Sequence, residues 1–411
     1  MGLEARVEKA IGELRGYLEA PLAIELWNGK RFAFSASPPV TLRVSGPRAA
    51  RTLVNADLEK LGTAYVEGLI DVDGPIREII RAAELLSARG GGYRPGRLPK
   101  LAFHTRKRDR EAIGYHYDVS NDFYALWLDR EMVYSCAYFQ KDDDRLEDAQ
   151  IQKLDHICRK LRLASGEKFL DIGCGWGALV RFAAKHYGVD ATGVTLSQNQ
   201  LALANERIRA EGLEDRCRVQ LLDYRDVPGE GVYDKIASVG MFEHVGLRNL
   251  PTYFATIHRL LKDGGIALNH GITAVDTESR FVGLGGGAFV DRYVFPHGEL
   301  PHLMLVIATM GAEKLEVMDV ETLRLHYAKT LWHWSDRLEG NLERARALTD
   351  ERRIRIWRTY LAGCAHAFDS NWVTIQQVLA VKSSNSKASP LPLTRDWIYR
   401  STDGGAPRKA S

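Results

Sequence analysis

The residues best suited to chemistry begin with a glycine-rich loop, DIGCGWG, at residues 171–177. The apolar run at 168–172 predicts a buried strand before the loop, and the pattern at 178–187 predicts a helix after it. Glycines in such a loop let the backbone turn sharply and let a ligand approach closely. The start of the helix offers unpaired N–H groups and a positive dipole. The loop by itself predicts either a plain tight turn or a site for a nucleotide-like ligand.

Two further motifs narrow the choice of ligand. The glycine spacing is GxGxG rather than GxGxxG, and no acidic residue ends the next predicted strand, 190–194, where dinucleotide folds hold a ribose. That strand runs into TLSQNQ at 195–200, whose hydroxyls and amides can bond a ribose and an amino-acid group. DYRD at 223–226 follows the third strand, where an adenine would lie. Together the three motifs predict S-adenosylmethionine as the ligand.

Alternating strands and helices must position these motifs. Helices are expected at about 146–161, 178–187 and 197–211, and strands at 168–172, 190–194, 218–222, 235–239 and 265–270. This alternation predicts an α/β fold with a doubly wound, Rossmann-like parallel sheet of the class I methyltransferase type.

The first 90 residues predict a smaller N-terminal α+β domain. One helix face is marked by Leu3, Val7, Ile11, Leu14 and Leu18, and alternating strands flank an Asn-Gly turn at 28–29. The expected domains are therefore an N-terminal accessory domain at 1–90, a linker rich in Gly, Arg and Pro at 91–110, a catalytic domain at 111–383 and a tail at 384–411.

Composition excludes several classes of protein. The net charge is only +3, and no basic groove with interleaved aromatics is visible, so no nucleic-acid partner is expected. Five cysteines without a CxxC pair argue against a disulfide framework or a metal site and for a reducing compartment. The first residues do not form a signal peptide, and no window is apolar enough to span a bilayer. Basic runs at 94–110 and 344–358 are either solvated faces or patches for anionic lipid.

Nine stretches of the chain together resemble the cyclopropane-fatty-acyl-phospholipid synthase family. They are EAIGYHYDVSNDFY (111–124), MVYSCAYF (132–139), FLDIGCGWG (169–177), GVTLSQNQ (193–200), LLDYRD (221–226), VGMFEHVG (239–246), DRYVFPHGELP (291–301), HYAKTLWHW (326–334) and YLAGCAHAF (360–368). YSCAYF, GMFEHVG and YVFPHGELP are the most specific. Ser120 departs from the pattern, since the bacterial synthases often carry glycine there. Residues 1–100 resemble the family's lipid-binding accessory domain less sharply.

The resemblance implies transfer of a methylene from S-adenosylmethionine to a cis double bond of an unsaturated phospholipid. The reaction passes through a carbocation, so the site needs a dry apolar tunnel, stabilisation of positive charge and an aimed base. Aromatic faces can stabilise the cation, although core packing explains each of them equally well. These aromatic residues are Tyr115, Tyr117, Tyr134, Tyr138, Phe139, Phe242, Tyr327, Trp332 and Trp334.

In this family a bound bicarbonate is the implied base. By motif, the residues carried over to its cradle are Cys136, Glu243, His270, Ile272 and Tyr327. Ile272 would donate through its backbone N–H, and Glu243 would orient His270 or accept the O–H of bicarbonate. Cys364 also stands at a position regarded as catalytic in the family. Packing of a small apolar side chain remains the alternative for it, because the reaction needs no thiolate.

The resemblance also supplies the cofactor contacts. They are Tyr134, Ser135, Gly173, Gly175, Thr195, Ser197, Gln198, Gln200, Tyr224 and Arg225. Gly177 is expected to serve helix–strand packing. The glycines at 283–287 suit either a mobile flap or an ordinary surface loop. The implied setting is cytoplasmic, peripheral to the inner face of the membrane, with unsaturated phospholipid as partner and a homodimer as a further expectation.

Three alternatives remain open at this stage. The same carbocation can lose a different proton and give a methylene-branched or methyl-branched chain. A non-catalytic lipid-binding or lipid-transfer protein would use the N-terminal domain alone. A nucleic-acid methyltransferase would share the cofactor, but the chain has no NPPY-like loop.

Overall fold

The computed structural model describes residues 3–50, 53, 57–89, 120–277, 286–295, 298–383 and 390–399. The chain divides into two compact units. Unit 1 comprises residues 1–100, 281–296 and 334–372, and unit 2 comprises residues 101–280, 297–333 and 373–411. Unit 1 therefore takes in two segments that the sequence assigns to the catalytic domain. The expected linker, the glycines at 283 and 285, and most of the tail lie outside the described residues.

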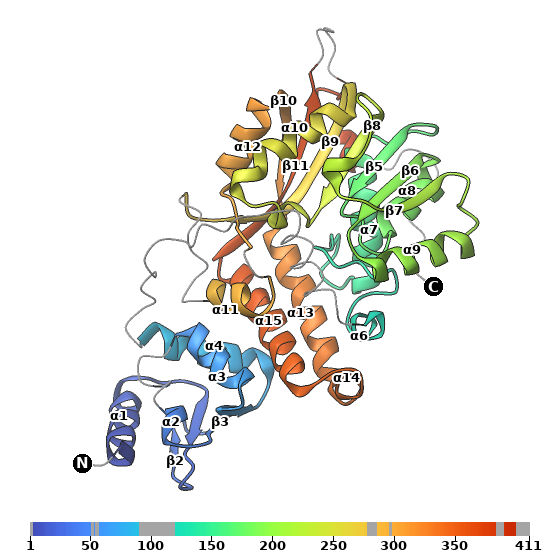
Figure 1. The fold of residues 1–411 in the computed structure, drawn as a ribbon. Coiled ribbons are helices and arrows are strands. Elements are labelled where there is room, and N and C mark those ends of the chain that lie inside the picture. The colour runs from blue at the N-terminus through green and yellow to red at the C-terminus, as the bar shows by residue number, and fades with distance from the viewer. Residues whose placement is uncertain are drawn as a thin grey trace. The chain divides into compact units, whose positions relative to one another are not determined.

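Unit 2 is built on a seven-stranded sheet with the order β10-β11-β9-β8-β5-β6-β7, in the upper part of Figure 1. The strands are β5 (Lys168–Ile172), β6 (Asp190–Thr195), β7 (Cys217–Leu221), β8 (Tyr233–Val239), β9 (Leu261–Ala274), β10 (Leu315–Thr322) and β11 (Val373–Lys382). β5 to β9 pair in parallel, whereas β11 is antiparallel to both β9 and β10. The predicted doubly wound parallel sheet is confirmed, and two strands at one edge, β10 and β11, were not predicted.

Helices cover both faces of this sheet. They are α6 (Asn121–Ala125), α7 (Leu146–Lys160), α8 (Ala178–Tyr187), α9 (Gln198–Ala210), α10 (Leu250–Leu260), α12 (Leu303–Ala312), the first part of α13 (Arg324–Gly340) and α16 (Asp396–Tyr399). Short 3-10 turns lie at Tyr224–Asp226, Phe242–His244 and Leu247–Asn249.

The burial of β5 on both faces explains why strands of this sheet appear in the sequence as continuous apolar runs. Phe169 belongs to an apolar core with α7 and α8, whereas Leu170 and Ile172 belong to a second core with α10 and α12. Alternate side chains of a strand point to opposite faces, so a strand covered on both faces needs apolar residues at every position. Asp171 breaks this rule, since its carboxyl group is buried in the same strand.

Unit 1 contains a four-stranded sheet with the order β2-β1-β3-β4. Its strands are β1 (Leu22–Glu25), β2 (Arg31–Ala33), β3 (Val40–Val44) and β4 (Ile70–Asp73). The predicted hairpin is confirmed, because β1 and β2 are antiparallel and Gly29 has a φ of 82° in the turn between them. The helices are α1 (Leu3–Tyr17), α2 (Pro47–Ala50), α3 (Leu58–Val66), α4 (Ile76–Arg89), α11 (Gly286–Tyr293), the end of α13, α14 (Leu342–Leu348) and α15 (Glu351–Asp369).

The predicted apolar face of α1 is also confirmed. Val7 and Ile11 of α1 are buried in a core that they share with strand residues such as Leu22 and Val40. α15 packs against α3 and α4 and so completes unit 1 from the far end of the sequence. Within the described part of the chain, no helix is long and apolar enough to cross a membrane.

Candidate active site

The glycine loop joins β5 to α8 by three left-handed residues. Gly173, Gly175 and Gly177 have φ values of 81°, 55° and 79°, which side chains other than glycine rarely adopt. A Cβ atom on Gly177 would lie 3.1 Å from Cβ of Ala204 in α9, which confirms a packing role for that glycine. A Cβ atom on Gly175 would meet no atom within 4 Å, so this side of the loop is open to a ligand.

A pocket opens above this loop, at the carboxyl ends of β5, β6 and β8. Eight of the ten predicted cofactor residues line it: Tyr134, Ser135, Gly173, Gly175, Thr195, Gln200, Tyr224 and Arg225. The other two, Ser197 and Gln198, are not among its lining residues. Ser197 instead caps α9, where its Oγ accepts a hydrogen bond from the N–H of Gln200 at 3.3 Å.

Hydrogen bonds hold the polar wall of this pocket in place. Oγ1 of Thr195 donates to Oε1 of Gln200 at 2.7 Å. Arg225 pairs with Asp223 through two side-chain hydrogen bonds of 2.7 and 2.8 Å, and Tyr224 packs edge-on against Tyr253. The DYRD motif therefore presents an oriented aromatic ring and a neutralised guanidinium, which suits an uncharged base such as adenine.

Two ionisable residues of the pocket were not among the individual contacts that the resemblance supplied, Lys153 and Asp171, although Asp171 is the first residue of the predicted binding loop. Nζ of Lys153 donates to Oγ of Ser135 at 2.7 Å, and burial lowers the pKa of this ammonium to about 8. Burial likewise raises the pKa of Asp171 to about 7, and its Oδ1 has no hydrogen-bond partner among the described residues. A carboxyl group left in this state is an acceptor for a cationic ligand group, such as the ammonium of an amino acid.

The sequence contained a signal for Lys153. The buried face of α7 includes Leu146, Ala149, Leu154 and Ile157, and Lys153 falls on the same face. A lysine on the apolar stripe of an amphipathic helix needs a reason to be buried. Here the reason is the pocket that it lines.

A second group of buried polar residues lies at the same edge of the sheet. β8 ends at Val239, while β9 continues to Ala274, so the N–H of Ile272 has no strand partner on that side. Oε1 of Glu243 accepts this N–H at 2.7 Å. Ile272 therefore anchors Glu243 through the same N–H that the family resemblance assigns to the bound anion.

Phe242 explains the glycine between His270 and Ile272. A Cβ atom on Gly271 would lie 1.9 Å from Cε1 of Phe242, so the ring packs directly on the β9 backbone. This contact keeps the 3-10 turn at Phe242–His244 close to β9, and with it the carboxyl group of Glu243.

Glu243 and His270 each keep one buried atom without a partner among the described residues, Oε2 and Nε2 respectively. Burial raises the pKa of Glu243 to about 7. Burial, with Lys153 and Lys160 nearby, holds the pKa of His270 well below its usual value, so the ring is neutral. Gln377 donates to Nδ1 of His270 at 3.2 Å, which leaves the ring proton on Nε2 as a donor. Gln377 was not predicted, and no hydrogen bond joins Glu243 to His270.

The remaining predicted cradle residues are also buried in unit 2. The thiol of Cys136 donates to the carbonyl of Ala137 at 3.3 Å and contacts that of Leu323 at 3.8 Å. Burial raises the pKa of Cys136, so it is a thiol and not a thiolate. Tyr327 lies in the first turn of α13 and is 7% exposed.

Six of the nine predicted aromatic residues lie in the described part of unit 2, and Trp334 lies in unit 1. Tyr134 lies 5.8 Å from Tyr124 and 5.4 Å from Trp127 between ring centroids. Tyr138 stacks on His156 and His326 at 4.1 and 4.8 Å. Tyr115 and Tyr117 lie outside the described residues.

Cys364 belongs to unit 1, where it lines an apolar pocket. The pocket is walled by β-strand residues such as Leu42, helix residues such as Ile79, Phe289 of α11, and Gly363 beside Cys364. The apolar surroundings raise the pKa of the Cys364 thiol to about 12. A thiol in this environment packs as a small apolar group rather than reacting as a nucleophile.

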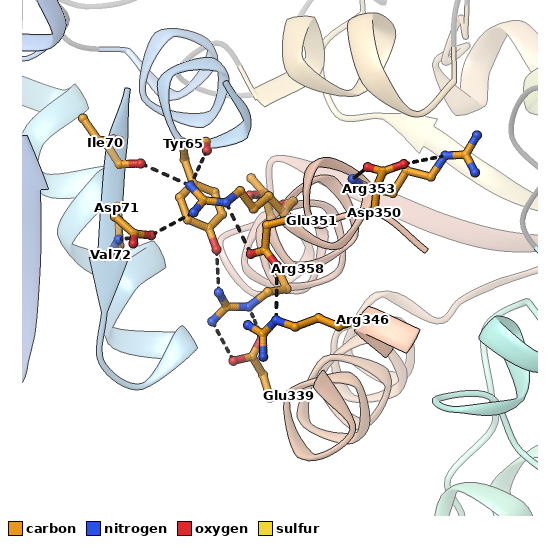
Figure 2. Close-up of polar contacts among 12 residues, drawn as sticks. Tyr65, Ile70, Asp71, Val72, Glu339, Arg346, Asp350, Glu351, Arg353 and Arg358 are labelled. Carbon is orange, nitrogen blue, oxygen red and sulfur yellow. Dashed lines mark hydrogen bonds and ion pairs between the residues drawn. The ribbon is translucent and has the colours of Figure 1, made fainter. Parts of the chain in front are cut away.

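Charged groups at this apolar pocket are paired with one another. Figure 2 shows Arg358 between Tyr65 and Glu339, and two of its hydrogen bonds to the Glu339 carboxylate measure 2.6 and 2.8 Å. These contacts raise the pKa of Arg358. His366 pairs with Glu84 at 3.1 Å. The pocket in unit 1 therefore offers an apolar surface and no unpaired cation at these two positions.

The fold and the pocket of unit 2 define a class I methyltransferase that uses S-adenosylmethionine. Solved structures agree with this class. The cyclopropane synthase MmaA2 from Mycobacterium tuberculosis superposes with a TM-score of 0.64 at 32% identity, covering 69% of this chain and 100% of that chain. A mycolic acid cyclopropane synthase, CmaA1, complexed with SAH and CTAB, gives a TM-score of 0.64 at 35% identity over 66% and 98% of the two chains.

A family model described as mycolic acid cyclopropane synthetase matches residues 104–378, and a domain of unknown function matches residues 13–87. The chain therefore belongs to the cyclopropane synthase family of S-adenosylmethionine-dependent lipid methyltransferases, as its motifs predicted. A probable fatty acid methyltransferase from Pseudomonas putida is 51% identical over 93% of this chain and 97% of its own length. The cyclopropane-fatty-acyl-phospholipid synthase of Escherichia coli K12 is 35% identical over 87% and 92%.

Proposed function

We propose that this protein is a cyclopropane-fatty-acyl-phospholipid synthase. Its substrate is the cis double bond of an unsaturated phospholipid acyl chain, and its product carries one additional methylene as a three-membered ring. The observation that carries the proposal is the pair of buried, unpartnered atoms at the carboxyl edge of the sheet, Oε2 of Glu243 and Nε2 of His270. Buried polar atoms without partners are costly, so they mark a place where a polar ligand binds.

S-adenosylmethionine supplies the methyl group when it is bound in the pocket above the glycine loop. Asp171 would accept a hydrogen bond from the amino end of the ligand, and Lys153 holds Ser135 at the wall of the pocket. Tyr224 would hold the adenine. These residues would bind and orient the methyl donor for transfer to the alkene.

The π electrons of the double bond would form a C–C bond to the methyl carbon while the S–CH3 bond breaks. S-adenosylhomocysteine would then be the leaving group, and a cation would remain on the other carbon of the former double bond. Loss of one proton from the new methyl group closes the ring. Bound bicarbonate would supply the base for this proton. A bicarbonate ion has both the acceptor oxygens and the O–H that the two unpartnered atoms need: the ring N–H of His270 would donate to an oxygen of the anion, and Oε2 of Glu243 would accept its O–H.

The other cradle residues act by positioning and by excluding water. The backbone of Ile272 fixes the Glu243 carboxyl group at 2.7 Å, and Gln377 sets the His270 tautomer. Cys136 contributes a neutral, buried wall, and Tyr327 contributes a ring at the start of α13. Water must be kept from the cation, because it would capture it before the ring closes.

The apolar pocket of unit 1 suits the hydrocarbon part of a lipid. The charge of Arg358 is already paired with Glu339, and His366 already contacts Glu84, so a free carboxylate gains little there, whereas an esterified chain loses nothing. We assign the N-terminal unit the role of lipid-binding accessory domain on this basis, with Cys364 as part of the wall. The enzyme works in the cytoplasm, peripheral to the inner membrane face, and a homodimer is its proposed assembly.

A methylene-branched or methyl-branched product is the second candidate, because the Pseudomonas putida relative is named a probable fatty acid methyltransferase. The two outcomes share every step up to the cation and differ in the proton that is lost. The cradle around Glu243 and His270 favours ring closure, since it offers a place for a base of its own.

The test is product analysis. Purified protein is incubated with S-adenosylmethionine, bicarbonate and vesicles of cis-unsaturated phospholipid, and the acyl chains are analysed by mass spectrometry and proton NMR. A mass gain of one methylene together with upfield ring signals is expected. A vinylidene or branched-methyl signal supports the second candidate, and the absence of any mass gain under all lipid conditions overturns both.

A further inference from the structure

The outer face of α12 is apolar. The helix has the sequence LMLVIATMGA, with no charged side chain over its whole length. Val306 and Met310 are buried against the core of unit 2, so the opposite face should be polar in an ordinary surface helix. Instead, Met304 is 66% exposed and Leu305 is 40% exposed.

Contacts at the end of β9 place the start of α12 at the carboxyl edge of the sheet. Ala274, the last residue of β9, forms a bridge with His302, and its N–H donates to the carbonyl of Pro301 at 3.0 Å. Val275 follows directly and is 40% exposed. The first turn of α12 thus lies beside the end of the strand that carries His270.

A further exposed side chain lies at the same edge. β10 and β9 run in the same direction, because each is antiparallel to β11. Leu325 follows the end of β10 by three residues and is 64% exposed. Four large apolar side chains, at positions 275, 304, 305 and 325, are therefore exposed at the carboxyl edge of the sheet. The cofactor pocket and Glu243 lie at the same edge. We call these four residues the apolar edge.

We propose that the apolar edge docks the catalytic unit on the surface of a phospholipid bilayer. The inference rests on the proposed function, in which the substrate is a lipid that must leave a bilayer to reach Glu243 and His270. A docking surface at the same edge as the reacting groups shortens that transfer and keeps the acyl chain away from water. It also accounts for apolar side chains that the fold itself does not bury.

The number of exposed residues favours a bilayer over a second copy of the chain. A stable protein–protein interface uses about 20 residues from each partner, and the apolar edge offers four large side chains. A bilayer has no such requirement, because each apolar side chain that enters the boundary between head groups and acyl chains contributes separately. An uncharged helix such as α12 can settle into that boundary without burying a charge.

The proposal is tested by co-sedimentation with sucrose-loaded vesicles of dioleoyl phosphatidylethanolamine and phosphatidylglycerol, without S-adenosylmethionine. The double variant M304D/L305D is compared with the wild type and with Leu393→Asp, which carries the same change at an exposed leucine outside the apolar edge. The vesicle partition coefficient of the double variant is expected to fall about 100-fold, since each buried apolar side chain is worth roughly tenfold. The control is expected to bind like the wild type.

Two further measurements keep the test decisive. Turnover on lipid dispersed in detergent should be unchanged in M304D/L305D, because the catalytic groups are intact. If the aspartates prevent folding, M304S/L305S replaces them, and Met304→Trp reports insertion by a blue shift of its fluorescence. Unchanged vesicle binding overturns the proposal, and so does a loss of dimer with vesicle binding retained, which would make a second copy the occupant. Vesicle binding without any lipid product would leave the apolar edge standing and overturn the proposed function alone.

Discussion

The two pockets of this protein handle their charged groups in opposite ways. The pocket in unit 1 is apolar, Arg358 is neutralised by Glu339, and His366 contacts Glu84 at 3.1 Å. At the carboxyl edge in unit 2, three buried titratable groups keep an unpartnered atom among the described residues: Asp171, Glu243 and His270. A buried polar atom without a partner costs stability until a ligand arrives, whereas a paired one has already regained much of the free energy of its desolvation. Under the proposed function, this difference distinguishes a pocket that binds an acyl chain from a site that performs a reaction.

Among substitutions in the two pockets, a change of Glu243 should have the largest effect. Glu243→Gln keeps the shape of the side chain and the hydrogen bond from the N–H of Ile272. The amide NH2 that replaces Oε2 is a hydrogen-bond donor, so it cannot accept the O–H of bicarbonate. Turnover is expected to fall by about 100-fold or more, while S-adenosylmethionine affinity changes by less than about threefold. Turnover assays and calorimetry on the same preparation measure both. Glu214→Gln, at an exposed glutamate of the same unit, is the control. Loss of cofactor affinity in E243Q would show that Glu243 belongs to the cofactor pocket instead.

The pH dependence of stability gives the next largest effect. The folded-state pKa of Glu243 is raised from 4.5 to about 7, so the folded protein holds this proton more tightly than the unfolded chain. The resulting stability is present below pH 4.5 and is lost as the pH rises to about 7. Glu243→Gln has no such loss. Its unfolding free energy should therefore gain on the wild type by up to about 3 kcal/mol across this window. Urea titrations at several pH values measure the difference, and a constant difference would contradict it.

Removing a charge pair in unit 1 should lower the unfolding free energy and leave cofactor binding unchanged. Glu339→Gln leaves the guanidinium of Arg358, whose side chain is 14% exposed, without its carboxylate. A loss of roughly 2 kcal/mol of unfolding free energy is expected, somewhat less than for a fully buried pair. Glu13→Gln removes an exposed pair with Lys9 and should cost less than about 0.5 kcal/mol. Denaturation curves and cofactor calorimetry test both points. Equal losses of unfolding free energy in the two variants would mean that the Arg358–Glu339 pair contributes no more than an exposed pair.

The smallest effect is expected at Gly363, on the wall of the apolar pocket. A Cβ atom at this position meets nothing within 4 Å, and the residue lies inside α15. Gly363→Ala should therefore raise the unfolding free energy by about 0.5 kcal/mol through a lower entropy of the unfolded chain. Thermal melts measure the gain. Gly363→Leu projects further into the pocket and should weaken the binding of a fluorescent acyl probe. A lower unfolding free energy for G363A would contradict the open geometry.

Local patterns predicted the parts of the fold that local chemistry determines. The strand 168–172 was predicted with its observed bounds, because burial on both faces leaves a continuous apolar run. The sharp turn of the loop was predicted from its glycines, because they adopt the left-handed conformations that the turn requires. The cofactor contacts came from the family resemblance instead, and eight of those ten residues line the pocket.

What local patterns did not predict depends on distant partners. β11 was missed because Gln376 and Gln377 interrupt its apolar run, and both are buried. Gln377 is buried because it bonds His270, which is 107 residues away in the sequence. The placement of α15 in unit 1 rests in the same way on packing against α3 and α4. Periodicity carries no information on such pairings.

Deuterium-labelled methyl donor tests the central claim most directly. The protein converts cis-unsaturated phospholipid in the presence of S-adenosylmethionine whose methyl group carries three deuterium atoms, and the extracted lipid is examined by deuterium NMR. If Glu243 and His270 hold the base that takes a proton from the new methyl group, the product retains two deuterium atoms in an upfield ring signal. A methyl signal that retains all three would contradict the account, because the proton would then have come from the acyl chain.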